Sequence, residues 1–298
     1  MDGATTTSIE LRDGRELAYA EYGDRSGTPV FYFHGTPGSR LEGMIADEAA
    51  RPLRIRLIAI DRPGIGRSAF KRRRMLRDWA ADVIELADAL GIDRFAIVGL
   101  SGGGPYALAG ARYIGSRLIG AAIVSGAAAS APGYVQRKNV VKRALYAIAF
   151  RATSAWAPVT AWWMMRGLRR TKPDRMTTWP DPRVLNRPRM RRLWRDALLE
   201  GFRNGSRGVA QDIRVLARKW DFRPEDIEAR VHVWHGDKDR VVPIAIGRYV
   251  AETVPRAEAT YFRDEGHLMI VDHIEEILRA LVDQAPGEEQ GEKTLRRS

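Results

Sequence analysis

The sequence contains no cysteine, and this absence excludes several kinds of chemistry. Without cysteine in its 298 residues, the chain cannot form disulfides, use a thiol nucleophile or bind a metal through thiolates. No uninterrupted apolar run approaches the ~20 residues that a membrane-spanning helix needs. Residues 1–5 show neither the basic nor the apolar region of a secretory signal peptide, so we expect a cytoplasmic location.

Histidine is also scarce, which limits the choice of a catalytic base. The chain has five histidines, at positions 34, 232, 235, 267 and 273.

The length of the chain, 298 residues, is sufficient to bury a large core. One α/β domain with an insertion fits this length better than two independent domains.

The most informative segment is Gly-Leu-Ser-Gly-Gly at 99–103. It follows an apolar, β-prone run and precedes a helix-like stretch, which is the context of a nucleophile elbow. In such a turn the hydroxyl of Ser101 is exposed at the tip, and the close backbone approach requires glycine at 99 and 103. The N–H of Gly102, next to the serine and at a helix N-terminus, is suited to bind an oxyanion.

A serine hydroxyl needs a base, and in this topology the order along the chain is serine, acid, histidine. His34 precedes Ser101, and the histidines at 232 and 235 belong to a predicted strand. His273 lies within a segment of helical periodicity and is interpreted as a surface helix residue. His267 follows a strand-like segment and lies in a loop, where wound sheets gather their functional side chains. We therefore predict that His267 is the base.

The acid is expected in the loop at 236–243, which follows the predicted strand 231–235. This loop offers two aspartates. Asp237 directly follows a glycine, a position typical of an aspartate that accepts backbone N–H bonds in a turn. Asp239 lies deeper, just before two apolar valines, and is favoured. The segment after the preceding predicted strand, residues 126–131, contains no carboxylate.

Five motifs occur in an order that is typical of a known family. They are His-Gly-Thr-Pro-Gly at 34–38, Asp-Arg-Pro-Gly-Ile-Gly-Arg-Ser at 61–68, the elbow at 99–103, Gly-Asp-Lys-Asp-Arg-Val-Val-Pro at 236–243, and Gly-His at 266–267. With these motifs the chain resembles the α/β-hydrolase superfamily, in its serine-nucleophile, esterase- or lipase-like branch with a His-Gly-x-Pro oxyanion motif. The resemblance runs from about residue 29 to about 282 and leaves only the middle segment unmatched.

The resemblance implies roles for individual residues. It implies that Ser101, Asp239 and His267 form the catalytic triad, in agreement with the elimination above. It places the second oxyanion N–H, beside that of Gly102, at Thr36. It makes Asp61 a structural residue of its loop. We interpret His34 as a support of the oxyanion loop and not as a proton acceptor.

The order of predicted elements indicates a wound sheet. A hairpin is expected around Asp13-Gly14, and further strands at 30–33, 57–60, 95–99, 119–124, 231–234 and 260–262. Helical periodicity between them, as at 79–90, favours a mostly parallel sheet with helices on both faces. The predicted class is α/β, with the eight-stranded sheet of the α/β-hydrolase fold and a helical cap.

Residues 127–224 interrupt the alternation of strands and helices. We predict a core of 1–126 with 225–283, a helical cap (lid) of 127–224 inserted between two strands, and a disordered tail at 284–298. Six of the eight tryptophans fall in the cap. Residues 126–224 also carry 22 Lys and Arg against 6 Asp and Glu, whereas the rest of the chain is slightly acidic.

The cap composition admits several interpretations. Arginines could solvate a helical surface over packed tryptophans, or Trp162, Trp163 and Met164 could line an apolar substrate pocket. Basic residues with tryptophan and leucine also suit a helix lying on an anionic membrane. Specific nucleic-acid binding is not expected, since no recognised motif accompanies the charge. We predict that the cap selects the substrate.

The function expected from these observations is a cofactor-free, metal-free serine hydrolase that cleaves carboxylic esters through an acyl-enzyme. The same triad could serve a perhydrolase (haloperoxidase-like), a C–C bond hydrolase, an amidase or an acyltransferase. A non-catalytic small-ligand receptor that retains the fold is the alternative of another class. The partner would be a small ester or acyl substrate, and the sequence does not specify the oligomeric state.

Overall fold

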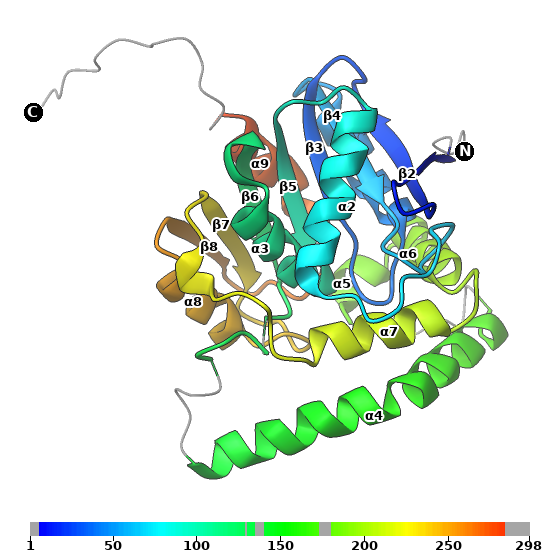
Figure 1. Cartoon of the computed structure of the whole chain (residues 1–298), viewed down its shortest axis with the longest axis vertical. Coiled ribbons are helices and arrows are strands. Elements are labelled where there is room, and N and C mark those ends of the chain that lie inside the picture. Colours follow the sequence, from blue (N-terminus) through cyan, green and yellow to red (C-terminus); the bar gives the residue numbers. More distant parts are fainter. Residues whose placement is uncertain (1–5, 129, 135–139, 173–179, 284–298) are drawn as a thin grey trace, which may run out of the picture.

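An eight-stranded sheet forms the centre of the protein in the computed structural model, which describes residues 6–128, 130–134, 140–172 and 180–283 (Figure 1). The strands follow the order β1-β2-β4-β3-β5-β6-β7-β8. Their bounds are β1 Thr6–Glu10, β2 Glu16–Gly23, β3 Thr28–Phe33, β4 Ile55–Ile60, β5 Phe95–Leu100, β6 Leu118–Val124, β7 Val231–Gly236 and β8 Ala257–Phe262. The predicted α/β-hydrolase sheet is confirmed.

The sequence pattern of each strand matches its place in the sheet. β1 and β2 form the expected hairpin and pair antiparallel, with Gly14 between them at a φ of +76°. β2 also pairs antiparallel with β4, and the pairs from β4 through β3 to β8 are parallel. The central strand β5 is apolar throughout because helices cover both of its faces.

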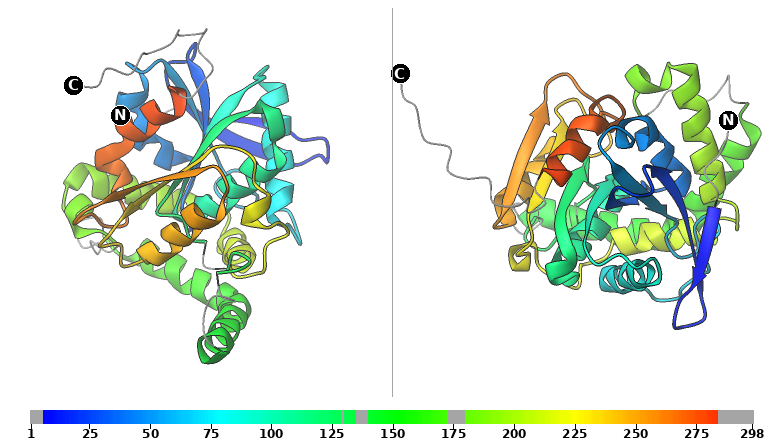
Figure 2. Two further views of the ribbon diagram at one scale, coloured as in Figure 1. Left: turned by 90° about the vertical axis from the view of Figure 1, so that its left-hand side faces the viewer. Right: turned by 90° about the horizontal axis from the view of Figure 1, so that it is seen from above.

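Helices cover both faces of the sheet, and each face has its own apolar core. One core joins the sheet to α2, α3 and α8, and the other joins it to α1 and α9 (Figures 1 and 2). These helices are α1 Asp47–Ala50, α2 Leu76–Ala89, α3 Gly104–Tyr113, α8 Ile244–Thr253 and α9 Ile270–Val282. Side chains of β3 alternate between the two cores, with Phe31 and Phe33 in one and Val30 and Tyr32 in the other.

Within the described residues, the insertion between β6 and β7 contains helices joined by turns and irregular segments, and no strand. It contains α4 Val140–Arg170, α5 Pro182–Leu185, α6 Pro188–Gly201, α7 Arg207–Leu216 and the short helix η5 Pro224–Asp226. Figure 1 shows α4 and α7 across one end of the sheet, with α7 between α4 and the strands. The cap boundaries at 127 and 224 stay predictions, and the predicted disordered tail at 284–298 lies outside the described residues.

The cap packs on the core through a small apolar cluster. Ala157 and Ala161 of α4 are fully buried against Val209 of α7, together with Phe202 and Ile65. Small alanines allow the two cap helices to approach closely.

Over the described parts of the chain, no helix combines the length and the apolar character needed to cross a membrane.

Candidate functional site

Ser101 lies at a sharp turn between β5 and α3. Its φ is +50°, a left-handed conformation that costs roughly 1–3 kcal/mol for a residue other than glycine. The two motif glycines have no space for a side chain. A Cβ at Gly99 would lie 2.6 Å from the carbonyl oxygen of Gly103, and one at Gly103 would lie 2.1 Å from that of Phe33. The turn therefore has the geometry expected of a nucleophile elbow.

The loop after β7 brings Asp239, and not Asp237, to His267. Asp239 is buried, and its Oδ2 lies 2.8 Å from Nδ1 of His267. Its Oδ1 accepts the backbone N–H groups of Val241 and Val242, each at 2.8 Å, so both oxygens are fixed. Asp237 is exposed and accepts the backbone N–H of Asp264 at 2.7 Å; it accepts a backbone N–H as predicted, but this bond joins its loop to the loop after β8.

His235 also contacts Asp239, which sequence reasoning missed. Its ring Nε2 lies 2.8 Å from the carbonyl oxygen of Val242 and 3.3 Å from Oδ2 of Asp239. Burial would raise the pKa of the Asp239 carboxyl, but hydrogen bonds with His235 and His267 outweigh burial and hold that pKa well below its usual range. The only sequence signal for this contact was the four-residue spacing between His235 and Asp239.

Ser101 and His267 line the same cavity, which has a volume of about 300 Å³. Within the described residues no hydrogen bond joins the Ser101 hydroxyl to His267, although both residues line this space. The other described walls of the cavity are Gly35, Thr36, Pro37, Met164, Gly167, Leu168, Thr171, Pro180, Trp194, Leu198, Phe202 and Val241. They come from the core loops and from the cap, and most of them are apolar.

The structure places Thr36 beside Gly102. A Cβ added at Gly102 would lie 3.1 Å from the backbone nitrogen of Thr36 and 2.4 Å from its Oγ1. Thr36 follows β3 and Gly102 follows β5, and these strands are paired neighbours in the sheet. Two backbone segments that follow adjacent strands thus meet beside Ser101, and one of them, at Thr36, forms part of the cavity wall.

Of the three predicted substrate-binding residues, the structure brings only Met164 to the cavity. Trp162 and Trp163 are not among the cavity's described walls, and 42 % and 62 % of their surfaces are exposed. Met164 and Leu168 share one side of α4 because they are four residues apart, whereas the two tryptophans before them point elsewhere. The tryptophan that does line the cavity is Trp194, from α6.

A buried carboxylate of the cap holds the Thr36 loop. Asp212 of α7 accepts hydrogen bonds from the hydroxyls of Thr36 at 2.6 Å and Tyr106 at 2.7 Å, and it pairs with the guanidiniums of Arg62 and Arg74. Burial would raise the pKa of Asp212, but the two arginines hold it well below its usual range. Nothing in the sequence linked position 212 to position 36, because they lie 176 residues apart.

Arg62 and His34 complete the support of this loop. The Arg62 side chain donates hydrogen bonds to the carbonyl oxygens of His34 at 2.5 Å and Gly35 at 2.9 Å. His34 Nε2 accepts the backbone N–H of Arg62, and its Nδ1 lies 2.7 Å from the carbonyl oxygen of Gly35. Burial, reinforced by the Arg62 charge, lowers the pKa of His34 well below its usual value. His34 is therefore a neutral support of the loop.

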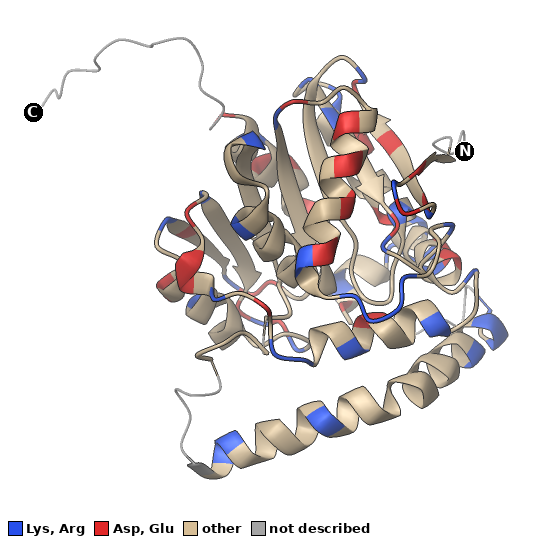
Figure 3. Ribbon diagram, viewed as in Figure 1, with Lys and Arg blue, Asp and Glu red and all other residues tan. Residues whose placement is uncertain are grey.

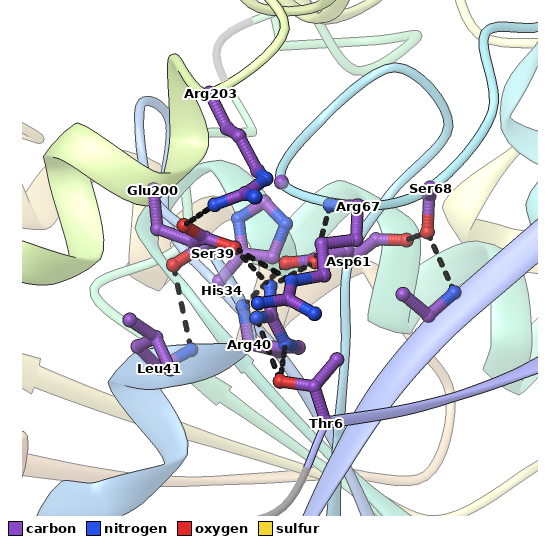
Figure 4. A network of polar contacts seen from close by, with 12 residues as sticks. Thr6, His34, Ser39, Arg40, Leu41, Asp61, Arg67, Ser68, Glu200 and Arg203 are labelled. Carbon is purple, nitrogen blue, oxygen red and sulfur yellow. Dashed lines mark hydrogen bonds and ion pairs between the residues drawn. The ribbon is translucent and has the colours of Figure 1, made fainter. Parts of the chain in front are cut away.

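Asp61 lies in a second buried network, which Figure 4 shows. Its side chain accepts hydrogen bonds from the backbone N–H groups of Arg40 and Arg67 and pairs at 2.5 Å with the Arg40 guanidinium. Arg40 also contacts Thr6 of β1 and Glu200 of α6. Both oxygens of Asp61 are thus engaged, and Arg40 extends this network to Glu200 of the cap.

Asp181, the N-cap residue of α5, contacts the His267 loop. Its Oδ2 accepts the backbone N–H of Leu268 at 3.1 Å, and a Cβ at Gly266 would lie 2.3 Å from the same oxygen. The carboxylate is buried. The cap therefore restrains the segment that carries His267 as well as the segment that carries Thr36.

Glu42 is a buried carboxyl beneath the Thr36 loop. Its Oε2 accepts the backbone N–H of Gly35 at 2.8 Å, while its Oε1 has no hydrogen-bond partner. Burial raises the pKa of Glu42 to about 7, although the Gly35 N–H and the nearby Arg62 charge oppose this rise.

Across the described residues, no three His, Asp or Glu side chains gather in a way that could hold a metal ion.

Comparison with known proteins agrees with this geometry. The sequence model of the alpha/beta hydrolase family matches residues 30–280. The chain belongs to the alpha/beta hydrolase family. The family suspected from the motifs and its fold are both confirmed. Membership in this family supports hydrolase activity.

Solved structures of hydrolases share the fold at low sequence identity. An esterase from Exiguobacterium antarcticum is 18 % identical with a TM-score of 0.69, covering 94 % of this chain and 99 % of its own. A hydrolase from Pseudomonas aeruginosa is 20 % identical with a TM-score of 0.68, covering 93 % and 98 %. A thermophilic esterase from Thermogutta terrifontis is 22 % identical with a TM-score of 0.67, covering 95 % and 99 %.

The chain spans only part of the length of the curated relatives that it matches. It is 26 % identical over 89 % of its own length to the dihydrolipoyllysine-residue acetyltransferase component of the acetoin cleaving system from Pseudomonas putida, and covers 65 % of that protein. It is 36 % identical to a proline iminopeptidase from Xylella fastidiosa, but over 33 % of this chain and 32 % of the relative.

The Asp212 network predicts a large loss of stability on truncation. Asp212→Ala leaves two buried guanidiniums without a counter-charge, so the free energy of unfolding should fall by about 3–5 kcal/mol in urea denaturation. The control is Asp196→Ala, which removes an exposed cap aspartate 4.0 Å from Arg195 and should cost at most about 1 kcal/mol. Equal losses in the two variants would contradict the structural role of Asp212.

The raised pKa of Glu42 predicts a pH-dependent stability. Between the ordinary carboxyl pKa near 4.5 and the folded-state value of about 7, the folded chain retains a proton that the unfolded chain has lost. This group therefore lowers stability as pH rises through that window, by on the order of 3 kcal/mol. Glu42→Gln, which keeps an acceptor for Gly35, should gain stability relative to wild type between pH 4.5 and pH 8.

Urea denaturation of the wild type and of Glu42→Gln at pH 4.5 and at pH 8 measures this difference in the free energy of unfolding. The other titrating groups are the same in both proteins, so their contributions cancel. Glu48→Gln, at an exposed glutamate, is the control and should differ from wild type equally at both pH values. A pH-independent difference for Glu42→Gln would show that the carboxyl at 42 titrates normally.

Proposed function

We propose that the protein is a cofactor-free serine hydrolase that cleaves carboxylic esters through an acyl-enzyme. The observation that carries this proposal is the convergence of three segments at one cavity. Ser101 at the elbow and His267 line the cavity, and the carboxylate of Asp239 lies 2.8 Å from the ring of His267. A hydroxyl, an imidazole and a carboxylate in this relation are the components of nucleophilic acyl transfer.

In the proposed acylation step, His267 accepts the Ser101 proton as Oγ attacks the ester carbonyl carbon. Nδ1 of His267 faces the ionised Asp239, so that nitrogen carries the ring proton and Nε2 is left as the base. The carbonyl oxygen becomes an oxyanion, and the N–H groups of Thr36 and Gly102 are its proposed donors. The tetrahedral intermediate then expels the alcohol, which takes the proton from His267.

Deacylation repeats the same steps with water as the nucleophile. His267 accepts a proton from water as the oxygen attacks the acyl carbon, and it returns that proton to Oγ of Ser101 when the acid leaves. The low pKa of Asp239 supports this cycle, because an ionised carboxylate stabilises the imidazolium that forms in both halves. His235 and the N–H groups of Val241 and Val242 help to keep Asp239 ionised.

The walls of the cavity favour an uncharged acyl group. Met164, Leu168, Trp194, Leu198 and Phe202 give it an apolar surface, and no Asp or Glu is found among its described walls. An enzyme that removes an N-terminal proline accepts a protonated amine, and burying such a charge without a partner is costly. We therefore favour ester cleavage over the activity named for the iminopeptidase relatives.

The acetyltransferase relative raises acyl transfer to another acceptor as a variant of this proposal. Acylation of Ser101 would be identical, and only the second nucleophile would differ. The serine, histidine and aspartate would keep the same roles. Both variants therefore predict the same results for substitutions in the triad.

Ser101 should react with a fluorophosphonate probe, which labels serines activated by a neighbouring base. We expect the wild type to be labelled and Ser101→Ala to remain unlabelled, with both shown to be folded by circular dichroism. Absence of labelling in the folded wild type would favour a non-catalytic receptor with this fold.

Asp239→Asn should lower kcat/KM for a p-nitrophenyl ester by about 10,000-fold, because the amide cannot hold His267 in the required tautomer. Asp237→Asn, the matched variant in the same loop, should change it by less than about tenfold, since Asp237 only accepts a backbone N–H. The opposite ranking would overturn the assignment of the acid.

A further inference from the structure

Helix α4 carries most of the exposed large apolar side chains of the molecule. Nine such side chains are exposed among the described residues, and seven of them lie on α4. The seven are Val141, Leu145, Ile148, Trp156, Val159, Trp162 and Trp163. Leu145 and Ile148 are about 60 % exposed. A contiguous apolar surface on this scale is typical of an interaction site.

These side chains form one stripe along the helix. Most successive members are three or four residues apart, Trp162 and Trp163 are adjacent, and the one longer interval is bridged by the exposed Ala152. Ala157 and Ala161 belong to the opposite face, where they are fully buried against α7 and its neighbours. Helix α4 is therefore apolar on two sides. One side is covered by the body of the protein, and the other, which we call the α4 stripe, is not.

The charge of α4 indicates what covers the stripe. The 31 residues of the helix contain six Lys and Arg and no Asp or Glu. Figure 3 shows basic residues along α4 and no acidic one. Two copies of this face would place like charges together, which opposes self-association. A nucleic acid would pair with the arginines but would leave aliphatic side chains such as Leu145 and Ile148 in water.

We propose that the α4 stripe binds the surface of a membrane that contains anionic lipids. Basic residues attract the anionic headgroups, and the aliphatic and tryptophan side chains enter the boundary with the acyl chains. The exposed pair Trp162 and Trp163, with rings 5.1 Å apart, has the amphipathic character favoured at that depth. The helix is about 45 Å long and lies along the surface without crossing it.

The position of α4 in the fold supports this occupant. Figures 1 and 2 show α4 at the outer edge of the molecule, with one end extending beyond the rest of the cap. The other end supplies Met164 and Leu168 to the walls of the Ser101 cavity. With the α4 stripe on a membrane, helix α4 lies between the bilayer and the Ser101 cavity. This membrane contact does not depend on the proposed hydrolase activity.

Flotation with vesicles tests the proposal on the full chain. The wild type should bind vesicles of phosphatidylglycerol and phosphatidylcholine more strongly than vesicles of phosphatidylcholine alone. Binding to the anionic vesicles should weaken roughly tenfold between about 0.05 M and 0.5 M salt, because salt screens the basic residues. Leu145→Glu combined with Ile148→Glu should reduce binding at low salt by roughly tenfold or more.

Matched variants separate the stripe from a general effect of added charge. Met75→Glu and Tyr261→Glu introduce the same charge at the other two exposed apolar positions, which lie outside α4, and should leave vesicle binding unchanged. The circular dichroism spectrum and the thermal unfolding of the double variant should match those of the wild type. This readout does not depend on enzyme activity and would show that the loss of binding is not a loss of folding.

Several results would overturn the proposal. One is absence of wild-type binding to anionic vesicles at low salt, and another is equal binding by the α4 double variant. A third is a wild type that sediments as a dimer, becomes a monomer on substitution of the stripe and does not bind vesicles. That result would assign the α4 stripe to a second copy of the chain.

Discussion

The carboxylate of Asp212 links parts of the molecule that would otherwise be independent. It lies on the cap helix α7, yet its four partners come from the loops after β3 and β4 and from helix α3. Two buried guanidiniums and one buried carboxylate are costly to take out of water, and only close pairing compensates that cost. The cap and the Thr36 loop are therefore fixed relative to each other by electrostatics as well as by apolar packing.

The site contains two buried acidic side chains whose pKa values are shifted in opposite directions. Asp239 has hydrogen bonds to both oxygens, and its pKa is held low, so it is suited to stabilise a positive charge on His267. Glu42 is fully buried beneath Gly35 and has one oxygen without a partner, so its pKa is raised to about 7. Burial acts to raise the pKa of both carboxyls, and the stronger hydrogen bonding of Asp239 reverses that effect whereas the weaker hydrogen bonding of Glu42 does not.

Much of the fold could be predicted from the sequence because its signals are local. The elbow at 99–103, the Asp13-Gly14 hairpin and the apolar strand runs each depend on a few neighbouring residues. The preference for Asp239 over Asp237 was also local, since it depended on the apolar residues that follow. The observed geometry places Asp239 against His267, and the catalytic roles of both stay predictions.

Long-range polar contacts could not be predicted in this way. The contacts of Asp181 and Asp212 depend on how the cap folds back on the core, and neither residue lies in a motif. The orientation of Trp162 and Trp163 was also beyond prediction, although these residues are neighbours in the sequence. One interpretation of the cap composition placed Trp162 and Trp163 in a substrate pocket, but the helical phase of α4 turns these two outward, and the tryptophan at the cavity is Trp194 of α6. A pattern of residue types does not specify helix rotation when both faces are apolar.

The three acidic anchors of the cap have a consequence for how such enzymes diversify. Asp181 restrains the His267 segment, Asp212 the Thr36 loop, and Glu200 the Arg40–Asp61 pair. The insertion is thus not an interchangeable module that affects specificity alone. A chimera that received a foreign cap would need equivalents of all three carboxylates, or it would change the alignment of the loops that carry Thr36 and His267 together with the shape of the pocket.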